Sequence, residues 1–76
     1  MIPVKTMNAL IPGQTATVRQ IGQTGLAARL RELGLICGTR VTCVGRSPCG
    51  DPKAYLIRGA VIALREADCR QITLEP

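Results

Sequence analysis

Histidine, phenylalanine and tryptophan are absent from this chain of 76 residues, and Tyr55 is its only aromatic residue. Without histidine, the Ser-His-Asp triad and the Cys-His pair are excluded in their usual forms. Proline-rich peptides bind in aromatic-lined grooves, and single-stranded nucleic acids stack their bases on aromatic rings. Because one tyrosine cannot build either surface, the sequence disfavours both kinds of ligand.

Acidic residues are also few, five against ten lysines and arginines, which gives a net charge of +5. Their spacing in the sequence does not mark any two of them as an acid/base couple. The chain has no G-x4-G-K-[ST] loop, so it is not a nucleotide hydrolase of that type. We therefore expect no enzyme activity and no cofactor. The basic charge permits an acidic protein, a nucleic acid or an anionic membrane surface as partner.

Long apolar runs are missing as well, since none approaches the roughly 20 residues needed to cross a bilayer. Pro12 and Gly13 interrupt the only apolar stretch that resembles the core of a signal peptide. From these features we expect a cytoplasmic protein. The length predicts one domain over residues 1–76.

Four cysteines are present, and their spacing does not predict a metal site. No two of them form the close C-x2-C pair that is usual for zinc. Without a signal peptide, disulfides are also disfavoured. We interpret the four as small apolar residues and expect no metal ligand among them, with a metal-binding or redox role as the alternative. The residues are Cys37, Cys43, Cys49 and Cys69, of which Cys49 is expected to be the most reactive.

Short segments of alternating apolar and polar residues predict a mostly β protein. Val41 and Cys43 fall on one face of such a segment, and Arg40, Thr42, Val44 and Arg46 on the other. In the last segment, Ile72 and Leu74 are expected to point inward. Strands are predicted over residues 15–21, 39–46, 53–58, 60–65 and 70–75, after a loose lead-in over 1–7 and a turn over 8–13.

One helix is predicted over residues 26–33, because Leu26, Leu30 and Leu33 recur at helical spacing and form an apolar stripe. Thr24 is the expected N-cap. Gly34 suits the left-handed position after the helix, with Leu35 folding back onto the last turn. A single helical turn is expected over residues 66–69. Five strands and one short helix after the first strand predict a small, strongly bent SH3-like barrel, with an OB-like barrel as the alternative.

The segment between the second and third strands carries the most distinctive chemistry. Pro48 and Pro52 cannot pair in a central strand, because proline lacks a backbone N–H. Gly50 supplies a positive φ, and Asp51 is a residue that hydrogen-bonds its own turn. The segment is therefore predicted to be a rigid, exposed hairpin tip, a type of place that often carries function.

Several short motifs follow one another along the chain in a defined order. They are Leu30-Arg31-Glu32-Leu33-Gly34-Leu35, Gly38 and Val41, Pro48-Cys49-Gly50-Asp51-Pro52, Arg58-Gly59, and Ala63-Leu64-Arg65 with Asp68. Together they resemble the FeoA family, small cytoplasmic proteins of bacterial ferrous iron uptake, from about Leu10 to Leu74. The resemblance implies an SH3-like barrel with a helix after the first strand. It also implies an accessory role for FeoB, the membrane transporter with a GTPase domain.

The cysteines depart from the family pattern, since Cys37 stands where the family often has proline. Cys43, Cys49 and Cys69 stand where it often has apolar or small residues, which favours packing over an iron site. Our hypothesis is a non-enzymatic adaptor that docks on FeoB at the inner face of the membrane. The alternatives are a cysteine-based metal or redox protein and a basic barrel that binds nucleic acid, although no nucleic acid is expected. The expected contact residues are Arg29 and Arg31 on the helix and Arg46, Ser47, Pro48, Cys49, Gly50, Asp51, Pro52 and Lys53 at the tip.

Overall fold

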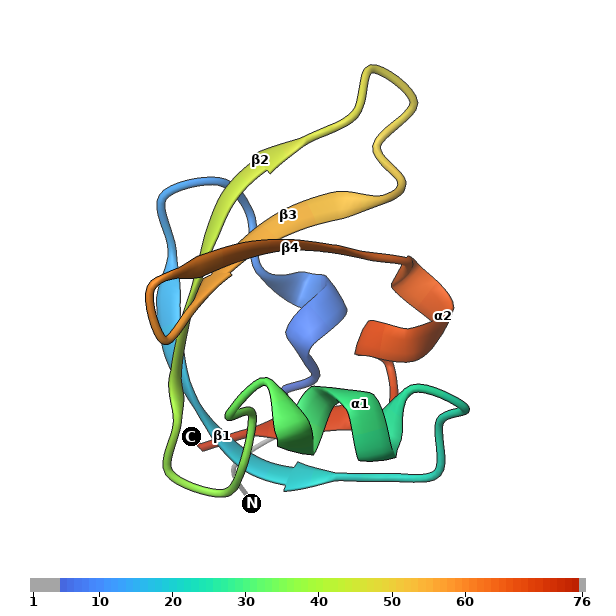
Figure 1. Ribbon diagram of the computed structural model, residues 1–76. Coiled ribbons are helices and arrows are strands. Elements are labelled where there is room, and N and C mark those ends of the chain that lie inside the picture. Colours follow the sequence, from blue (N-terminus) through green and yellow to red (C-terminus); the bar gives the residue numbers. More distant parts are fainter. Residues whose placement is uncertain (1–4, 76) are drawn as a thin grey trace.

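Five strands and three short helical segments make up the chain in a computed structural model that describes residues 5–75 (Figure 1). The helical segments are η1 (Met7–Ala9), α1 (Ala27–Glu32) and α2 (Glu66–Cys69). The strands are β1 (Thr15–Ile21), β2 (Arg40–Arg46), β3 (Lys53–Ile57), β4 (Ala60–Leu64) and β5 (Ile72–Leu74). Each predicted strand is present, with its ends moved by no more than two residues, and the predicted turn over 66–69 is α2.

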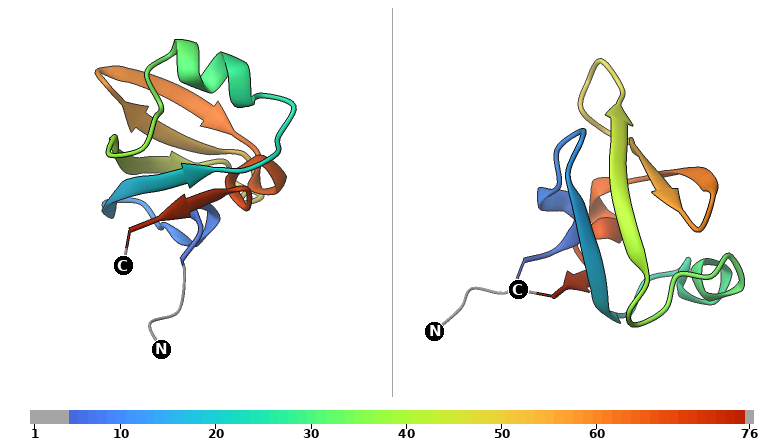
Figure 2. Two further views of the ribbon diagram at one scale, coloured as in Figure 1. Left: turned by 90° about the horizontal axis from the view of Figure 1, so that it is seen from below. Right: turned by 90° about the vertical axis from the view of Figure 1, so that its left-hand side faces the viewer.

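All five strands belong to one antiparallel sheet in the order β4-β3-β2-β1-β5. The sheet bends strongly, as Figure 2 shows. Within residues 5–75 its edges, β4 and β5, do not pair with each other, so the closed barrel expected from the sequence is not found. β5, at one edge, has only three residues. The mostly β class and the helix after the first strand are confirmed.

Helix α1 is attached at both ends to the segments that flank β4. Before the helix, the Thr24 hydroxyl donates a hydrogen bond to Asp68 Oδ1 in α2 at 2.7 Å. After it, Gly34 lies against the side chain of Arg58, which precedes β4. Figure 1 shows α1 at the lower end of the molecule, below β4. These two contacts connect the helix to the segments before and after β4.

The end of α1 matches the sequence prediction. Leu35 N–H donates to Leu30 O at 2.8 Å and Gly34 N–H donates to Arg31 O at 3.0 Å, which are the two bonds of a Schellman motif. Gly34 has φ +97° and Leu35 is fully buried. The apolar stripe is only partly right, because Leu33 lies beyond the last helical residue and is 40% exposed.

The start of α1 differs from the prediction. The residue at the N-cap is Leu26, not Thr24. The Thr24 hydroxyl accepts a long hydrogen bond from Leu26 N–H at 3.3 Å while donating to Asp68. Thr24 therefore joins the two helices more than it caps one of them.

Replacing Gly34 with alanine is expected to lower the free energy of unfolding by about 1–2 kcal/mol, because the left-handed conformation is costly for alanine. A Cβ at this position would also lie 2.3 Å from Arg58 Cδ, so the arginine has to move. Urea unfolding measures the loss. Gly25→Ala is the control, since nothing lies within 4 Å of a Cβ there, and equal losses in the two variants would contradict the assignment.

The N-terminal segment is part of the core, which corrects the predicted lead-in over 1–7 and turn over 8–13. Residues 1–4 lie outside the described residues, but Met7 is fully buried in η1 and Leu10 is 6% exposed. Leu74 N–H donates to Lys5 O at 2.8 Å. Among residues 5–75, the buried apolar side chains are those of Met7, Leu10, Val18, Leu30, Leu35, Val41, Cys43, Tyr55, Ile57, Leu64, Cys69, Ile72 and Leu74.

An irregularity in β2 changes which side chains share a face. Cys43 pairs with Tyr55 and Gly45 with Ala54, so Val44 is an extra residue in the strand. Beyond it, Arg46 pairs with Lys53 and lies on the same face as Cys43. The predicted placement of Arg46 with Arg40 and Thr42 is therefore wrong, because simple alternation assumes an unbroken register.

Candidate partner-binding surface

The loop over residues 47–52 joins β2 to β3 and projects from the body of the protein (Figure 1). Ser47 N–H donates to Pro52 O at 3.1 Å, and Gly50 N–H donates to Ser47 O at 2.8 Å. Gly50 has φ +87°, as the sequence predicts. Most of the loop is exposed, with Ser47 and Gly50 half-buried. These two backbone bonds give the tip a defined shape.

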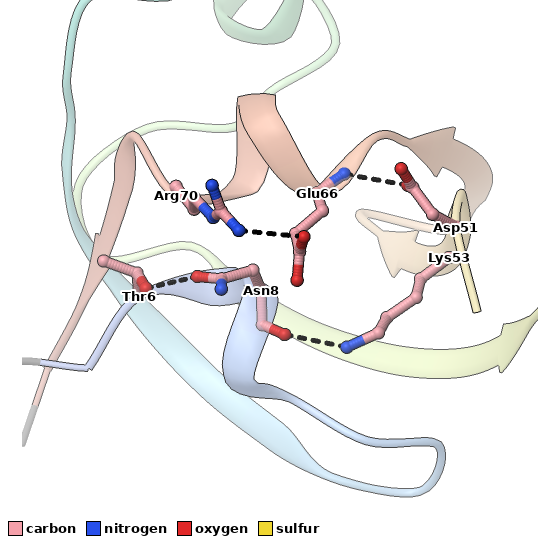
Figure 3. Close-up of polar contacts among 6 residues, drawn as sticks. All are labelled: Thr6, Asn8, Asp51, Lys53, Glu66 and Arg70. Carbon is pink, nitrogen blue, oxygen red and sulfur yellow. Dashed lines mark hydrogen bonds and ion pairs between the residues drawn. The ribbon is translucent and has the colours of Figure 1, made fainter.

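Asp51 braces the tip against α2, a role that sequence reasoning missed. Its Oδ1 accepts a hydrogen bond from Glu66 N–H at 2.9 Å, at the first residue of that helix (Figure 3). A carboxylate at this place satisfies a backbone donor that has no partner within the helix. The contact joins residues 15 positions apart, so no local turn pattern predicts it.

The ammonium group of the half-buried Lys53 is bound by backbone carbonyls of the protein itself. Its Nζ donates to Asn8 O at 2.7 Å and to Leu10 O at 2.8 Å, and thereby fastens the N-terminal segment to the hairpin (Figure 3). Arg46, directly opposite in the sheet, is exposed, and within residues 5–75 it has no ion-pair partner. Of the two cations expected at the base of the tip, Arg46 is therefore the one that is exposed to solvent.

Arg29 and Arg31 are exposed on α1, so the structure places them where a partner has access. They are not brought together with the tip, because α1 and the β2–β3 loop lie at opposite ends of the molecule (Figure 1). The predicted contact residues therefore form two separate surfaces. One is the tip with Arg46, and the other is the polar side of α1.

The cysteines divide into two exposed residues, Cys37 and Cys49, and two buried ones, Cys43 and Cys69. Burial raises the pKa of the Cys69 thiol, which keeps it in the unreactive protonated form. The part of the chain that the structure describes contains no group of three or more Cys, Asp or Glu side chains arranged to hold a metal ion. In the same part, no helix has the length and apolar character needed to cross a bilayer.

The model of the FeoA domain matches residues 5–76. A solved FeoA protein from Chlorobium tepidum is 25% identical, with 93% of this chain and 69% of that chain covered and a TM-score of 0.86. A FeoA-like protein from Clostridium acetobutylicum is also 25% identical, over 99% of this chain and 88% of the other, with a TM-score of 0.84.

The third relative is the FeoA of Stenotrophomonas maltophilia in complex with zinc, which is described as an SH3 domain protein. It is 26% identical, covers 93% of this chain and 89% of its own, and has a TM-score of 0.83. The SH3-like character of the fold, predicted from the sequence, is thereby supported. Among proteins with curated descriptions, none matches significantly.

Proposed function

Because this chain belongs to the FeoA domain family, we propose that it is a small non-enzymatic accessory protein of bacterial ferrous iron uptake. In this proposal it works in the cytoplasm and reaches the inner face of the membrane only through its partner. That partner is a FeoB-type membrane GTPase-transporter. No nucleic acid and no cofactor take part.

The observation that carries the proposal is the match of the family model over nearly the whole described chain, from residue 5 onward. The Stenotrophomonas maltophilia relative is described as a possible activating factor of ferrous iron transport. The position of the polar groups agrees with a binding role. Lys53 and Asp51 form hydrogen bonds within the protein. A partner would therefore recognise the shape of the tip and the exposed arginines, rather than these two charges.

The tip is the contact surface that this proposal favours. Its two backbone hydrogen bonds and the Asp51–Glu66 contact hold it in one shape before binding, so less conformational freedom is lost when a partner docks. Arg46 at its base supplies a positive charge that raises the rate of encounter with an acidic patch. Arg29 and Arg31 on α1 form the second candidate contact.

Gly50→Val is expected to weaken binding to the cytoplasmic domain of the cognate FeoB about tenfold. At φ +87° a β-branched residue is strongly disfavoured, so the tip adopts another shape. The space around Gly50 is open, so the sheet itself is expected to stay folded. Titration calorimetry measures the affinity, and circular dichroism checks the fold.

Gly13→Val is the matched control. Gly13 has φ +96° and an equally open surrounding, but it lies in the turn before β1. It is expected to impose the same kind of strain without loss of affinity. If Gly50→Val bound as tightly as the parent protein, the tip would not be the docking surface.

A further inference from the structure

The outer face of the sheet carries one continuous cross-strand row of four residues. Thr15 pairs with Thr42, Thr42 with Leu56, and Leu56 with Val61, so the row crosses β1, β2, β3 and β4. Its first half is polar, since the Thr15 and Thr42 hydroxyls are hydrogen-bonded at 2.9 Å. Its second half is apolar and open to solvent, with Leu56 39% exposed and Val61 65% exposed.

Two arginines border this row. Arg40 and Arg58 line one groove of about 340 Å³ together with Thr15, Thr42, Leu56 and Gly59. Within residues 5–75 neither guanidinium has an ion-pair partner. Neither β1, β2 nor the β3–β4 hairpin contains an aspartate or glutamate. The groove is therefore a cationic site next to an apolar strip, with no internal counter-charge on its own strands.

Arg58 occupies a backbone position that suits arginine poorly. It has φ +48°, and Gly59 after it has φ +84°, the two positive angles of the tight turn between β3 and β4. Asparagine, aspartate or glycine is preferred there, and an arginine costs about 1 kcal/mol. The stem of Arg58 packs against Gly34, which holds the residue in this conformation beside the groove. Strained backbone conformations are common at ligand-binding sites, so the conformation of Arg58 beside an open groove suggests that the groove binds a ligand.

We propose that this groove docks a protein segment that presents carboxylates and apolar side chains on the same face. The carboxylates would meet Arg40 and Arg58, and the apolar side chains would cover Leu56 and Val61. A second copy of this chain does not suit the groove, because two such faces are both basic and repel each other. A nucleic acid would leave the apolar strip uncovered, and the face has no aromatic ring for stacking. The inference rests on the proposed function as a binding protein, but it assigns a surface separate from the tip.

The first experiment adds a short synthetic peptide with the repeat Glu-Ser-Leu-Ser to the isotope-labelled full chain, because this repeat places glutamate and leucine on the same face of an extended segment. Amide NMR shifts are expected to move at Thr42, Leu56 and Val61 and to stay unchanged at the tip. A glutamate–serine peptide is expected to bind at least about tenfold more weakly, because it cannot cover the apolar strip. A lysine–leucine peptide, a DNA oligonucleotide and anionic vesicles are expected to leave these amides unmoved. If any of these three probes shifted the groove amides, the proposal would be wrong. It would also be wrong if none of the probes, including the glutamate–leucine peptide, shifted them.

The second experiment measures binding to the cytoplasmic domain of the cognate FeoB with the double variant Arg40→Glu/Arg58→Glu. Affinity is expected to fall about tenfold or more, because two attractive charges become repulsive. Arg19→Glu is the charge control on an exposed β1 position outside the groove, and it is expected to bind like the parent.

The two proposals fail in different ways. If the parent protein does not bind the FeoB domain, the proposed function fails, while the peptide shifts still report on the groove. If the parent binds and the double variant binds equally well, the groove is not the docking site and the proposed function stands.

Discussion

Replacing Tyr55 with alanine is expected to remove about half of the free energy of unfolding of this protein. Tyr55 is the largest fully buried side chain, and it pairs with Cys43 across the two central strands β2 and β3. Truncation of a buried aromatic residue costs about 3–5 kcal/mol. A domain of this size has only about 5–10 kcal/mol of stability, so the loss takes up much of the total. Circular dichroism followed through urea unfolding measures it.

Tyr55→Phe separates the ring from the hydroxyl. The hydroxyl donates one long hydrogen bond, 3.3 Å, to Met7 O, so its removal is expected to cost about 0.5–1.5 kcal/mol. Burial also raises the pKa of this hydroxyl well above its usual value, so the folded protein holds Tyr55 in the neutral form. If the alanine and phenylalanine variants lost equal stability, the ring would not be the packing element that its burial indicates.

Replacing Met7 with alanine is expected to lower the free energy of unfolding by about 2–5 kcal/mol, the range for a buried methionine. Met7 is fully buried, and η1 is held in place by Lys53 and Tyr55 from the hairpin. The thermal midpoint of unfolding should fall by several degrees for each kcal/mol lost. A loose lead-in, which is what the sequence alone predicts for residues 1–7, would give no loss.

Ile11→Ala is the matched control for Met7→Ala. Ile11 lies four positions further along, but it is 52% exposed, so its truncation is expected to change stability by less than about 0.5 kcal/mol. A result in which both variants match the parent protein would restore the sequence-based interpretation of the N-terminus.

The strands and the C-terminal end of α1 were predictable because local pattern decides them. Alternation places Val41 and Cys43 inward, and only a glycine such as Gly34 readily takes the left-handed turn that ends the helix. The burial of Met7 was not predictable, since it depends on partners such as Tyr55 that lie 48 positions away. The extra residue at Val44 was missed for the same reason, because register belongs to a pair of strands and not to one segment.

The candidate site was predictable in outline but not in the roles of its charges. Proline and glycine placement indicated the tip, and the structure confirms the positive φ of Gly50. The sequence alone predicted Lys53 as an exposed contact residue, whereas in the structure its ammonium group is bound by two backbone carbonyls. The groove beside Arg58 had no signal in the sequence, because its lining residues come from β1, β2 and the β3–β4 hairpin and meet only in the folded sheet.

The edge strand β4 is also where we expect the protein to aggregate under stress. The strand reads Ala60-Val61-Ile62-Ala63-Leu64, with no charge and no proline to discourage pairing with another chain. Ala60, Val61 and Ala63 in this strand are already exposed in the folded protein. Self-association during expression or heating would then begin from a nearly native molecule, at this edge of the sheet.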